Sequence, residues 1–190
     1  MPTDRSFLAQ KGNYRNLIAF QKAECIYDIT YYFAHHFFVE GKDRTVDQMV
    51  QAARSGKQNI AEGGSAATTS RESELKLVNV AKASLRELLL DYEDWLRVRG
   101  LQPWALDDPR CVQTRKAVAQ HNDSTYYREA IKERSPETIA NIAITLIHQA
   151  DMMLGRLLER LKQDFLTQGG IKEEMTRARL EYRKRNPSVP

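Results

Sequence analysis

Apolar residues recur at spacings of three and four along most of this chain, which is the pattern of helices that bury one face. Four long segments show this pattern, at residues 13–39, 45–62, 69–99 and 135–168. Only nine glycines and six prolines occur among the 190 residues, and their scarcity favours helices over a turn-rich β architecture. The pattern predicts an all-α protein.

Residues at the ends of these segments support the boundaries. Thr45 and Thr69 each precede a Gln or Glu by three positions, which is the spacing of a helix-starting capping box. Pro136 is expected at the first position of the fourth helix, just after Ser135, where its missing N–H costs nothing. Glycine pairs at residues 63–64 and 169–170 are expected to stop the second and fourth helices.

Long amphipathic helices with short connections predict an up-down-up-down antiparallel four-helix bundle. The third connection, residues 101–134, is too long for a tight turn. We expect it to be a partly helical insertion, with a helix at residues 109–120 and another turn or two at residues 124–132. The predicted organisation is one domain of residues 1–170, followed by a charged extension, residues 171–190, that forms a short helix.

Basic residues exceed acidic ones mainly near the C-terminus. The chain has a net charge of +4 and a pI of about 9.1. Residues 171–190 contain six basic and three acidic side chains, whereas residues 1–100 contain 14 basic and 13 acidic ones. A polyanionic partner would therefore meet its strongest attraction at the extension.

The expected location is the cytoplasm. Cys25 and Cys111 are distant and form no paired motif, which is typical of free thiols in a reducing compartment. The first residues include Asp4 and Arg5 and lack the apolar run of a signal peptide. The most apolar stretch, residues 139–147, is far shorter than the roughly 20 residues of a membrane span, so no membrane partner is expected.

A search for catalytic or metal-binding patterns finds little. A bundle with two metal ions needs Glu-x-x-His pairs, and no glutamate here precedes a histidine by three residues. His148 and Asp151 lie one turn apart and could offer two ligands, which is a weak signal. Cys25 lies beside an apolar face and reads as a packed thiol, and no phosphate-binding glycine motif occurs. We expect no enzyme, no cofactor and no metal.

Polar residues line one side of the second and third helices. They are Arg54, Ser55, Asn59 and Glu62 in the second helix, and Ser84, Glu87 and Asp91 in the third. If the two stripes face each other, Arg54 would pair with a carboxylate such as that of Glu87, and Asn59 would satisfy a neighbouring polar group. We interpret this group as a structural polar cluster that fixes helix register, with a polar ligand pocket as the alternative.

The same region carries a family resemblance. Residues 52–63 (AARSGKQNIAEG) resemble the signature of the bacterial four-helix-bundle proteins named for intervening sequences in 23S ribosomal RNA genes. Residues 14–17 (YRNL), 20–21 (FQ) and 84–87 (SLRE) are also similar to that family. The match extends over residues 14–99 and more loosely over the fourth helix.

The resemblance implies a four-helix protomer that assembles into a homopentameric ring. That family includes the accessory protein of diversity-generating retroelements, in which a basic surface of the ring engages nucleic acid and the polymerase. The insertion and the charged extension depart from the family pattern and leave the pentamer geometry open. A ribosomal role does not transfer, because it rests on gene location.

Nucleic-acid binding, to DNA or RNA, is the first hypothesis for function. Its candidate contacts are the basic residues of the extension, which are Lys172, Arg177, Arg179, Arg183, Lys184 and Arg185. The ordinary alternative is that these side chains solvate a short helix, with three glutamates balancing part of their charge.

A protein-interaction or scaffolding module is the second hypothesis. Trp104, Tyr126 and Tyr127 in the insertion could present a partner surface, or they could cap the end of the bundle. A small enzyme or ligand carrier near His148 and Asp151 is a third and weaker hypothesis.

Self-association is expected from the first helix. Ile18, Tyr31, Tyr32 and Phe38 lie outside its main apolar stripe. A helix that is apolar over much of its circumference is usually covered, and a neighbouring protomer is the simplest cover. The insertion or the extension could cover it instead.

Overall fold

The computed structural model describes residues 13–38 and 44–186. Its elements are the 3-10 helix η1 (Tyr14–Asn16) and the helices α1 (Ile18–Phe37), α2 (Thr45–Ala66), α3 (Arg71–Arg97), α4 (Pro109–Gln120), α5 (Ser124–Ala130), α6 (Pro136–Gln168) and α7 (Ile171–Arg185). No strand occurs in these described ranges, so the predicted all-α class is confirmed.

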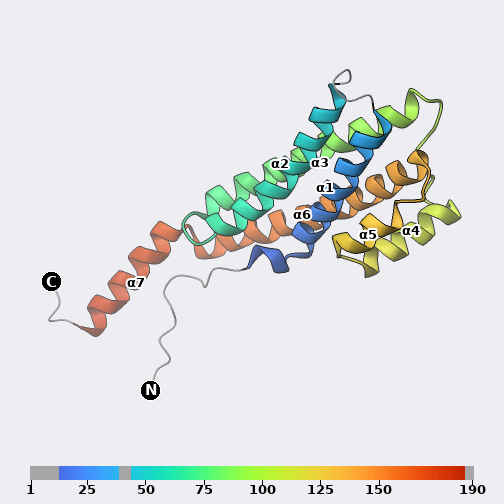
Figure 1. The fold of residues 1–190 in the computed structure, drawn as a ribbon. Helices are drawn as coiled ribbons and strands as arrows, with labels where there is room; N and C mark the ends of the chain where they lie inside the picture. Colours follow the sequence, from blue (N-terminus) through green and yellow to red (C-terminus); the bar gives the residue numbers. More distant parts are fainter. Residues whose placement is uncertain (1–12, 39–43, 187–190) are drawn as a thin grey trace.

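The four long helices pack around one core (Figure 1). α2 contacts α1 and α3, and α6 contacts the same two helices from the other side. The spaced apolar positions of the sequence fill the space between them, and Ile26, Phe33, Leu85, Leu88 and Leu146 are fully buried. Burial of this shared apolar surface supplies the main driving force for the fold.

Two polar groups inside this core satisfy each other. The Tyr92 hydroxyl donates to Thr30 Oγ1 over 3.0 Å, and the Thr30 hydroxyl donates to the Ile26 carbonyl over 2.7 Å. Both side chains are fully buried, so each needs a partner to offset the loss of water. This chain of hydrogen bonds joins α3 to α1.

The insertion lies along one end of the long helices (Figure 1). Its helix α4 packs against α6, and α5 packs against α1. The predicted helix at residues 109–120 is confirmed, with Asp108 as its N-cap residue and Pro109 in its first turn. The extension also forms the expected helix, α7, and Figure 1 shows it projecting from the opposite end of the protein.

Some helix ends differ from the expectation. The first segment begins with η1, and α1 starts only at Ile18, while Val39 lies outside the described residues. The N-cap residue of α2 is Arg44 and that of α3 is Ser70, each one position away from the expected threonine. Ser70 Oγ accepts from the Ser73 amide at 3.1 Å, so the cap is made by the next hydroxyl along the chain.

The prediction that the glycine pair at residues 63–64 stops the second helix is wrong. α2 continues through both residues to Ala66. Gly63 is buried, and a Cβ there would lie 3.4 Å from Val78 Cγ2 and 3.5 Å from Leu77 Cβ. These are ordinary van der Waals distances, so Gly63 lies in the interface of α2 with α3 without ending the helix.

Gly56 marks the closest approach of α2 to α3. A Cβ at this position would lie 2.7 Å from Leu85 Cδ2 and 2.9 Å from Leu85 Cγ. Leu85 is fully buried and surrounded by core residues, so it has little room to withdraw. The absence of a side chain at Gly56 is what allows the two helices to meet here.

We expect Gly56→Ala to destabilise the protein by about 1–3 kcal/mol, because overpacking outweighs the better helix propensity of alanine. Gly155→Ala in α6 is the matched control, since the nearest atom to its Cβ is Lys82 Nζ at 3.5 Å. That control should gain up to about 1 kcal/mol. Urea unfolding of both variants measures the difference, and equal gains in stability would contradict the close approach.

Candidate nucleic-acid interface

α7 begins at a rigid turn. Gly169 has φ +77°, a conformation that favours glycine, and it ends α6. The Gly170 amide donates to the Glu173 carboxylate over 2.6 Å, which satisfies one of the amides at the start of α7. Glu173 and Glu174 lie in the first turn and three basic residues in the last, so both ends complement the helix dipole.

Arg71 holds this turn against the start of α3. Its guanidinium donates to the Gly169 carbonyl over 2.6 Å, to Gln168 Oε1 over 3.0 Å and to Glu174 Oε2 over 3.1 Å. The Arg71 side chain is only 19% exposed. The direction in which α7 leaves the protein is therefore fixed by a partly buried, charge-assisted contact.

All six basic residues predicted as nucleic-acid contacts are exposed on α7. They are Lys172, Arg177, Arg179, Arg183, Lys184 and Arg185. The Glu174 carboxylate is already engaged by Arg71, which leaves Glu173 and Glu181 as the other acidic side chains of the helix. Clustered exposed guanidinium and ammonium groups can bind phosphates without any base-specific motif.

The structure brings together three members of the predicted polar cluster. Ser55 Oγ lies 2.9 Å from Ser84 Oγ, so a hydrogen bond joins α2 to α3. Asn59 Nδ2 donates to the Ser55 carbonyl over 2.9 Å and to Ser55 Oγ over 3.2 Å. Ser55 directly precedes Gly56 and Ser84 directly precedes Leu85, so these short side chains lie beside the close approach of the two helices. They form a hydrogen-bonded contact between α2 and α3.

The charged members of that cluster are not brought together. Arg54, Glu62 and Glu87 are all exposed, and the expected pair between Arg54 and Glu87 is not among the ion pairs of the described residues. The approach of α2 to α3 leaves room for hydroxyl groups at the interface, while the long charged side chains turn to solvent.

Asp151 has two cationic partners on α3. Its carboxylate lies 2.8 Å from Lys82 Nζ and 3.0 Å from Arg86 Nε. Partial burial acts to raise the pKa of Asp151, but hydrogen bonds from Lys82 and Arg86 hold it below its usual range. This carboxylate is thus committed to an α3–α6 contact, although His148 is exposed one turn away. The part of the chain that the structure describes contains no group of three or more potential metal ligands.

Sequence reasoning missed Lys22, whose side chain is fully buried. Its ammonium donates to the Val118 carbonyl and, over 2.6 Å, to the His121 carbonyl at the end of α4. These carbonyls belong to the set that a helix C-terminus leaves unpaired, and a cation is favourable there. Burial lowers the pKa of Lys22 to about 8. The signal in the sequence was a lysine on a helix that is apolar over most of its circumference.

Two neighbours of Lys22 bind the same segment. The Cys25 thiol donates to the Asn122 carbonyl over 3.5 Å, and the Tyr127 hydroxyl donates to the His121 carbonyl over 2.9 Å. Burial raises the pKa of Cys25 to about 12, so the thiol stays protonated. α1 thus holds the α4–α5 connection through backbone carbonyls rather than through side-chain pairs.

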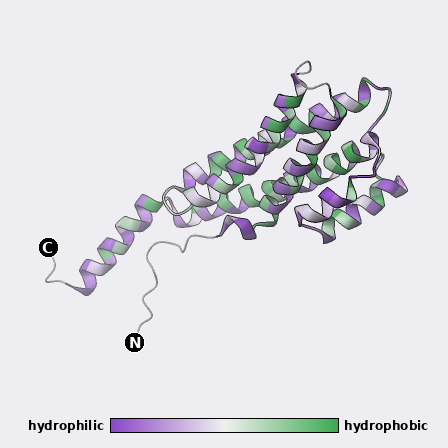
Figure 2. Ribbon diagram, in the orientation of Figure 1, coloured by the Kyte–Doolittle hydropathy of each residue, from purple (hydrophilic) through white to green (hydrophobic). Residues whose placement is uncertain are grey.

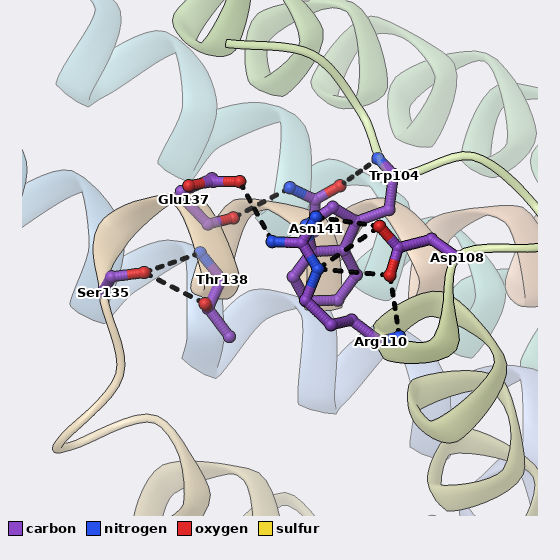
Figure 3. A network of polar contacts seen from close by, with 7 residues as sticks. All are labelled: Trp104, Asp108, Arg110, Ser135, Glu137, Thr138 and Asn141. Atoms are coloured by element: carbon purple, nitrogen blue, oxygen red, sulfur yellow. Dashed lines mark hydrogen bonds and ion pairs between the residues drawn. The ribbon is translucent and has the colours of Figure 1, made fainter.

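A second contact fixes the start of the insertion on α6 (Figure 3). The buried Asn141 accepts from the Trp104 amide over 2.7 Å and donates to the Glu137 carbonyl over 2.9 Å. Arg110 lies over the Trp104 ring at 4.8 Å and pairs with Asp108 at 2.8 Å. The insertion is therefore anchored near its start and at the connection between α4 and α5.

The insertion leaves an aromatic groove between α1 and α5. It has a volume of about 430 Å³ and is lined by Tyr27, Asp28, Tyr31, Tyr32, His35, His36, Arg128, Ile131 and Lys132. The rings of Tyr32 and His36 stack with centroids 3.8 Å apart, and those of Tyr31 and His35 lie tilted with centroids 4.2 Å apart. Each histidine Nδ1 lies 2.7 Å from the carbonyl four residues earlier, so that nitrogen carries the proton and Nε2 faces away.

The aromatic residues expected to form a partner surface have different positions. Tyr127 is buried and belongs to the core, and Trp104 is partly buried beneath Arg110. Only Tyr126 is exposed, and it stacks on His121 at 3.8 Å. Two of the three therefore attach the insertion to the long helices.

Comparison of the chain with protein-family models, with curated proteins and with solved structures finds no match. The resemblance described above therefore remains a prediction. In the described residues, no helix is both long and apolar enough to cross a membrane.

We expect Lys22→Met to lose about 1–3 kcal/mol of stability, because the Val118 carbonyl loses its donor and the His121 carbonyl keeps only the Tyr127 hydroxyl. Amides of residues 109–130 should exchange faster with solvent, and hydrogen exchange measures this. Lys116→Met, at an exposed site on α4, is the control and should change neither quantity. Unchanged exchange in Lys22→Met would contradict the anchoring role.

The pH dependence gives a separate test. The pKa of Lys22 is lowered from 10.5 to about 8 in the folded protein, so between these values the unfolded state binds more protons. Stability contributed by this site therefore rises with pH across that window and is lost as pH falls toward 8. From pH 8 to 10.5 the melting temperature of the unmodified protein should rise relative to that of Lys22→Met. A difference in melting temperature that stays constant over this range would contradict the lowered pKa of Lys22.

Proposed function

We propose that this chain is a non-catalytic, self-associating binding protein that contacts nucleic acid through α7. Its four long helices would form an up-down-up-down antiparallel four-helix bundle. The cycle of contacts among α1, α2, α3 and α6, and the short connection of residues 67–70 between α2 and α3, support that topology. Cys25 and Cys111 are buried free thiols, which fits the cytoplasm as the proposed location.

The observation that carries the proposal is the exposure of the basic face of α7. A helix that projects from the protein with six exposed cations presents an extended positive surface to a phosphate backbone. Among the described residues no activated nucleophile accompanies it, and the Cys25 thiol and Lys22 are engaged in structural contacts. Binding is thus the activity that the exposed chemistry supports.

Exposed apolar residues on α1 support self-association. Ile18 is 48% exposed and Tyr31 is 51% exposed. Tyr32 and Phe38 are partly buried and pack against the core, so they contribute less than expected. A homopentameric ring is proposed from the resemblance, and a ring would multiply the small charge excess of each chain.

The aromatic groove favours a second candidate, which is a protein partner bound beside the insertion. Tyrosine and arginine are enriched at protein interfaces, and Tyr31, Tyr32 and Arg128 line the groove together. Its cations are partly neutralised, because Arg128 lies 3.7 Å from Asp28 and Lys132 lies 2.8 Å from Glu129. That local balance suits a protein surface better than a polyphosphate.

The test is fluorescence anisotropy with short DNA and RNA, single-stranded and duplex, titrated with salt. We expect binding whose logarithm falls linearly with the logarithm of salt concentration. Replacing Arg183, Lys184 and Arg185 by alanine should weaken it and reduce the slope by about 2–3, one unit or slightly less for each lost phosphate contact.

Replacing three exposed cations of the insertion region gives a control of equal charge change. These are Arg115, Lys116 and Arg134. This control should keep the slope of the unmodified protein, and truncation after Gly170 should remove most of the binding. If neither nucleic acid binds near physiological salt, α7 has another role.

A further inference from the structure

α7 has an apolar stripe without a cover in the single chain. Ile171, Met175, Ala178 and Tyr182 follow one another at spacings of four, three and four, so they share one face. Met175 is 48% exposed and Tyr182 is 58% exposed. Figure 2 shows hydrophobic and hydrophilic positions alternating along this projecting helix. An isolated helix of 15 residues is only marginally stable in water and gains stability by burying such a face.

The outward side of α3 has a complementary composition. Val80, Leu90 and Val98 are 46%, 61% and 66% exposed. Glu87, Asp91 and Asp94 lie among them on the same side of the helix. We call these six residues the α3 acidic stripe. The stripe carries carboxylates, whereas α7 carries mainly cations. Both surfaces also contain exposed apolar side chains.

The carboxylates of the acidic stripe repel one another. Partial burial, together with the charges of Glu87 and Asp94, raises the pKa of Asp91 to about 6. Asp94 pairs with Arg97 at 2.7 Å, but both side chains are more than 60% exposed, and such a pair contributes little. A further cation placed on this stripe would therefore be favourable.

We infer that α7 of one copy lies along the α3 acidic stripe of a second copy, with its apolar face inward and Lys172 and Arg179 on the carboxylates. The inference rests on the self-association in the proposed function and adds a contact between α7 and α3 to the exposed apolar residues of α1. The two surfaces match in charge and in apolar character.

The charges on the two helices have the same spacing. Lys172 and Arg179 are seven residues apart on α7, and Glu87 and Asp94 are seven residues apart on α3. Seven residues are nearly two helical turns, about 10.5 Å along each axis. Both cations can therefore meet both carboxylates at once, in either helix direction. Met175, between the cations, would then lie near Leu90.

The α3 acidic stripe of the same chain is out of reach. Arg71 fixes the start of α7 beside the start of α3, and Asp94 lies 23 residues further along α3, about 35 Å away. Even if α7 folded back along α3, Arg179 would extend only about 12 Å from that start. A second copy supplies the acidic stripe without any change in the turn at residues 169–170.

This contact leaves part of α7 for another ligand. Arg177 and Lys184 are also seven residues apart, and they lie on the side away from the apolar stripe. They and the last turn of α7 stay available to phosphates while Lys172 and Arg179 are engaged. Self-association and nucleic-acid binding can therefore be measured separately on the full-length chain.

The test is the molar mass of the full-length protein by light scattering over a range of concentrations. We expect an assembly that Glu87→Lys with Asp94→Lys shifts toward the monomer. Asp107→Lys with Glu133→Lys changes the net charge equally at exposed sites in the insertion and should leave the mass unchanged. Circular dichroism checks that each variant keeps its helices.

Charge exchange provides the decisive variant. Lys172→Glu with Arg179→Glu should also dissociate the assembly, and combining it with Glu87→Lys and Asp94→Lys in one chain should restore the mass. If neither pair of charge reversals lowers the molar mass of the assembly, the α7–α3 contact is overturned while self-association stands. A protein that is monomeric at every concentration overturns self-association as well. Anisotropy of the alanine variant of Arg183, Lys184 and Arg185 with single-stranded DNA tests the nucleic-acid proposal separately, because these three residues are not the cations placed on the α3 acidic stripe.

Discussion

The contact between α2 and α3 at Gly56 constrains the whole arrangement. These two helices form the most extensive helix–helix contact of the protein, and they can meet only because Gly56 has no side chain against Leu85. Close approach fixes the rotation of α3 about its axis, so that Leu85 and Leu88 face the core. The same rotation turns Glu87, Leu90 and Asp94 to solvent. A requirement of core packing thus determines what the surface of α3 presents.

The insertion depends on a different interaction, the burial of the Lys22 ammonium. Burying a charge is unfavourable, as the lowered pKa of Lys22 shows, and carbonyls at the end of α4 offset part of that penalty. The Val118 carbonyl in turn would lack this donor without Lys22, and the His121 carbonyl would keep only the Tyr127 hydroxyl. Burial of the ammonium and burial of these carbonyls are each favourable only when the two are hydrogen-bonded to each other. This mutual requirement holds α4 and α5 at one place on α1. The aromatic groove exists because α5 is held at that distance from Tyr31 and Tyr32.

Periodicity predicted the all-α class and the extent of most helices, because apolar spacing reports directly which face of a helix is buried. It could not tell that α2 continues through the glycine at position 63, since a glycine at a helix end and one inside a helix look alike in sequence. Ser55 and Ser84 lie within hydrogen-bond distance, whereas Arg54 and Glu87 do not pair. The distance between two packed helices decides which side chains fit between them, and the sequence pattern does not give that distance. Lys22 was missed because its partners are backbone carbonyls about 100 residues away, which leave no side-chain pattern.

The turn between α6 and α7 links these surface features to assembly. A contact of α7 with α3 of the next copy joins unlike surfaces, so it repeats head to tail and closes into a ring only if the rotation between copies allows it. The direction of α7 sets that rotation, and Arg71 sets the direction of α7 through its bonds to Gly169 and Glu174. The number of copies in a closed ring would thus be determined at Arg71 rather than at the contact itself. Because the Arg71 contacts are charge-assisted and partly buried, they can keep that angle the same in every copy, which is what a closed ring requires.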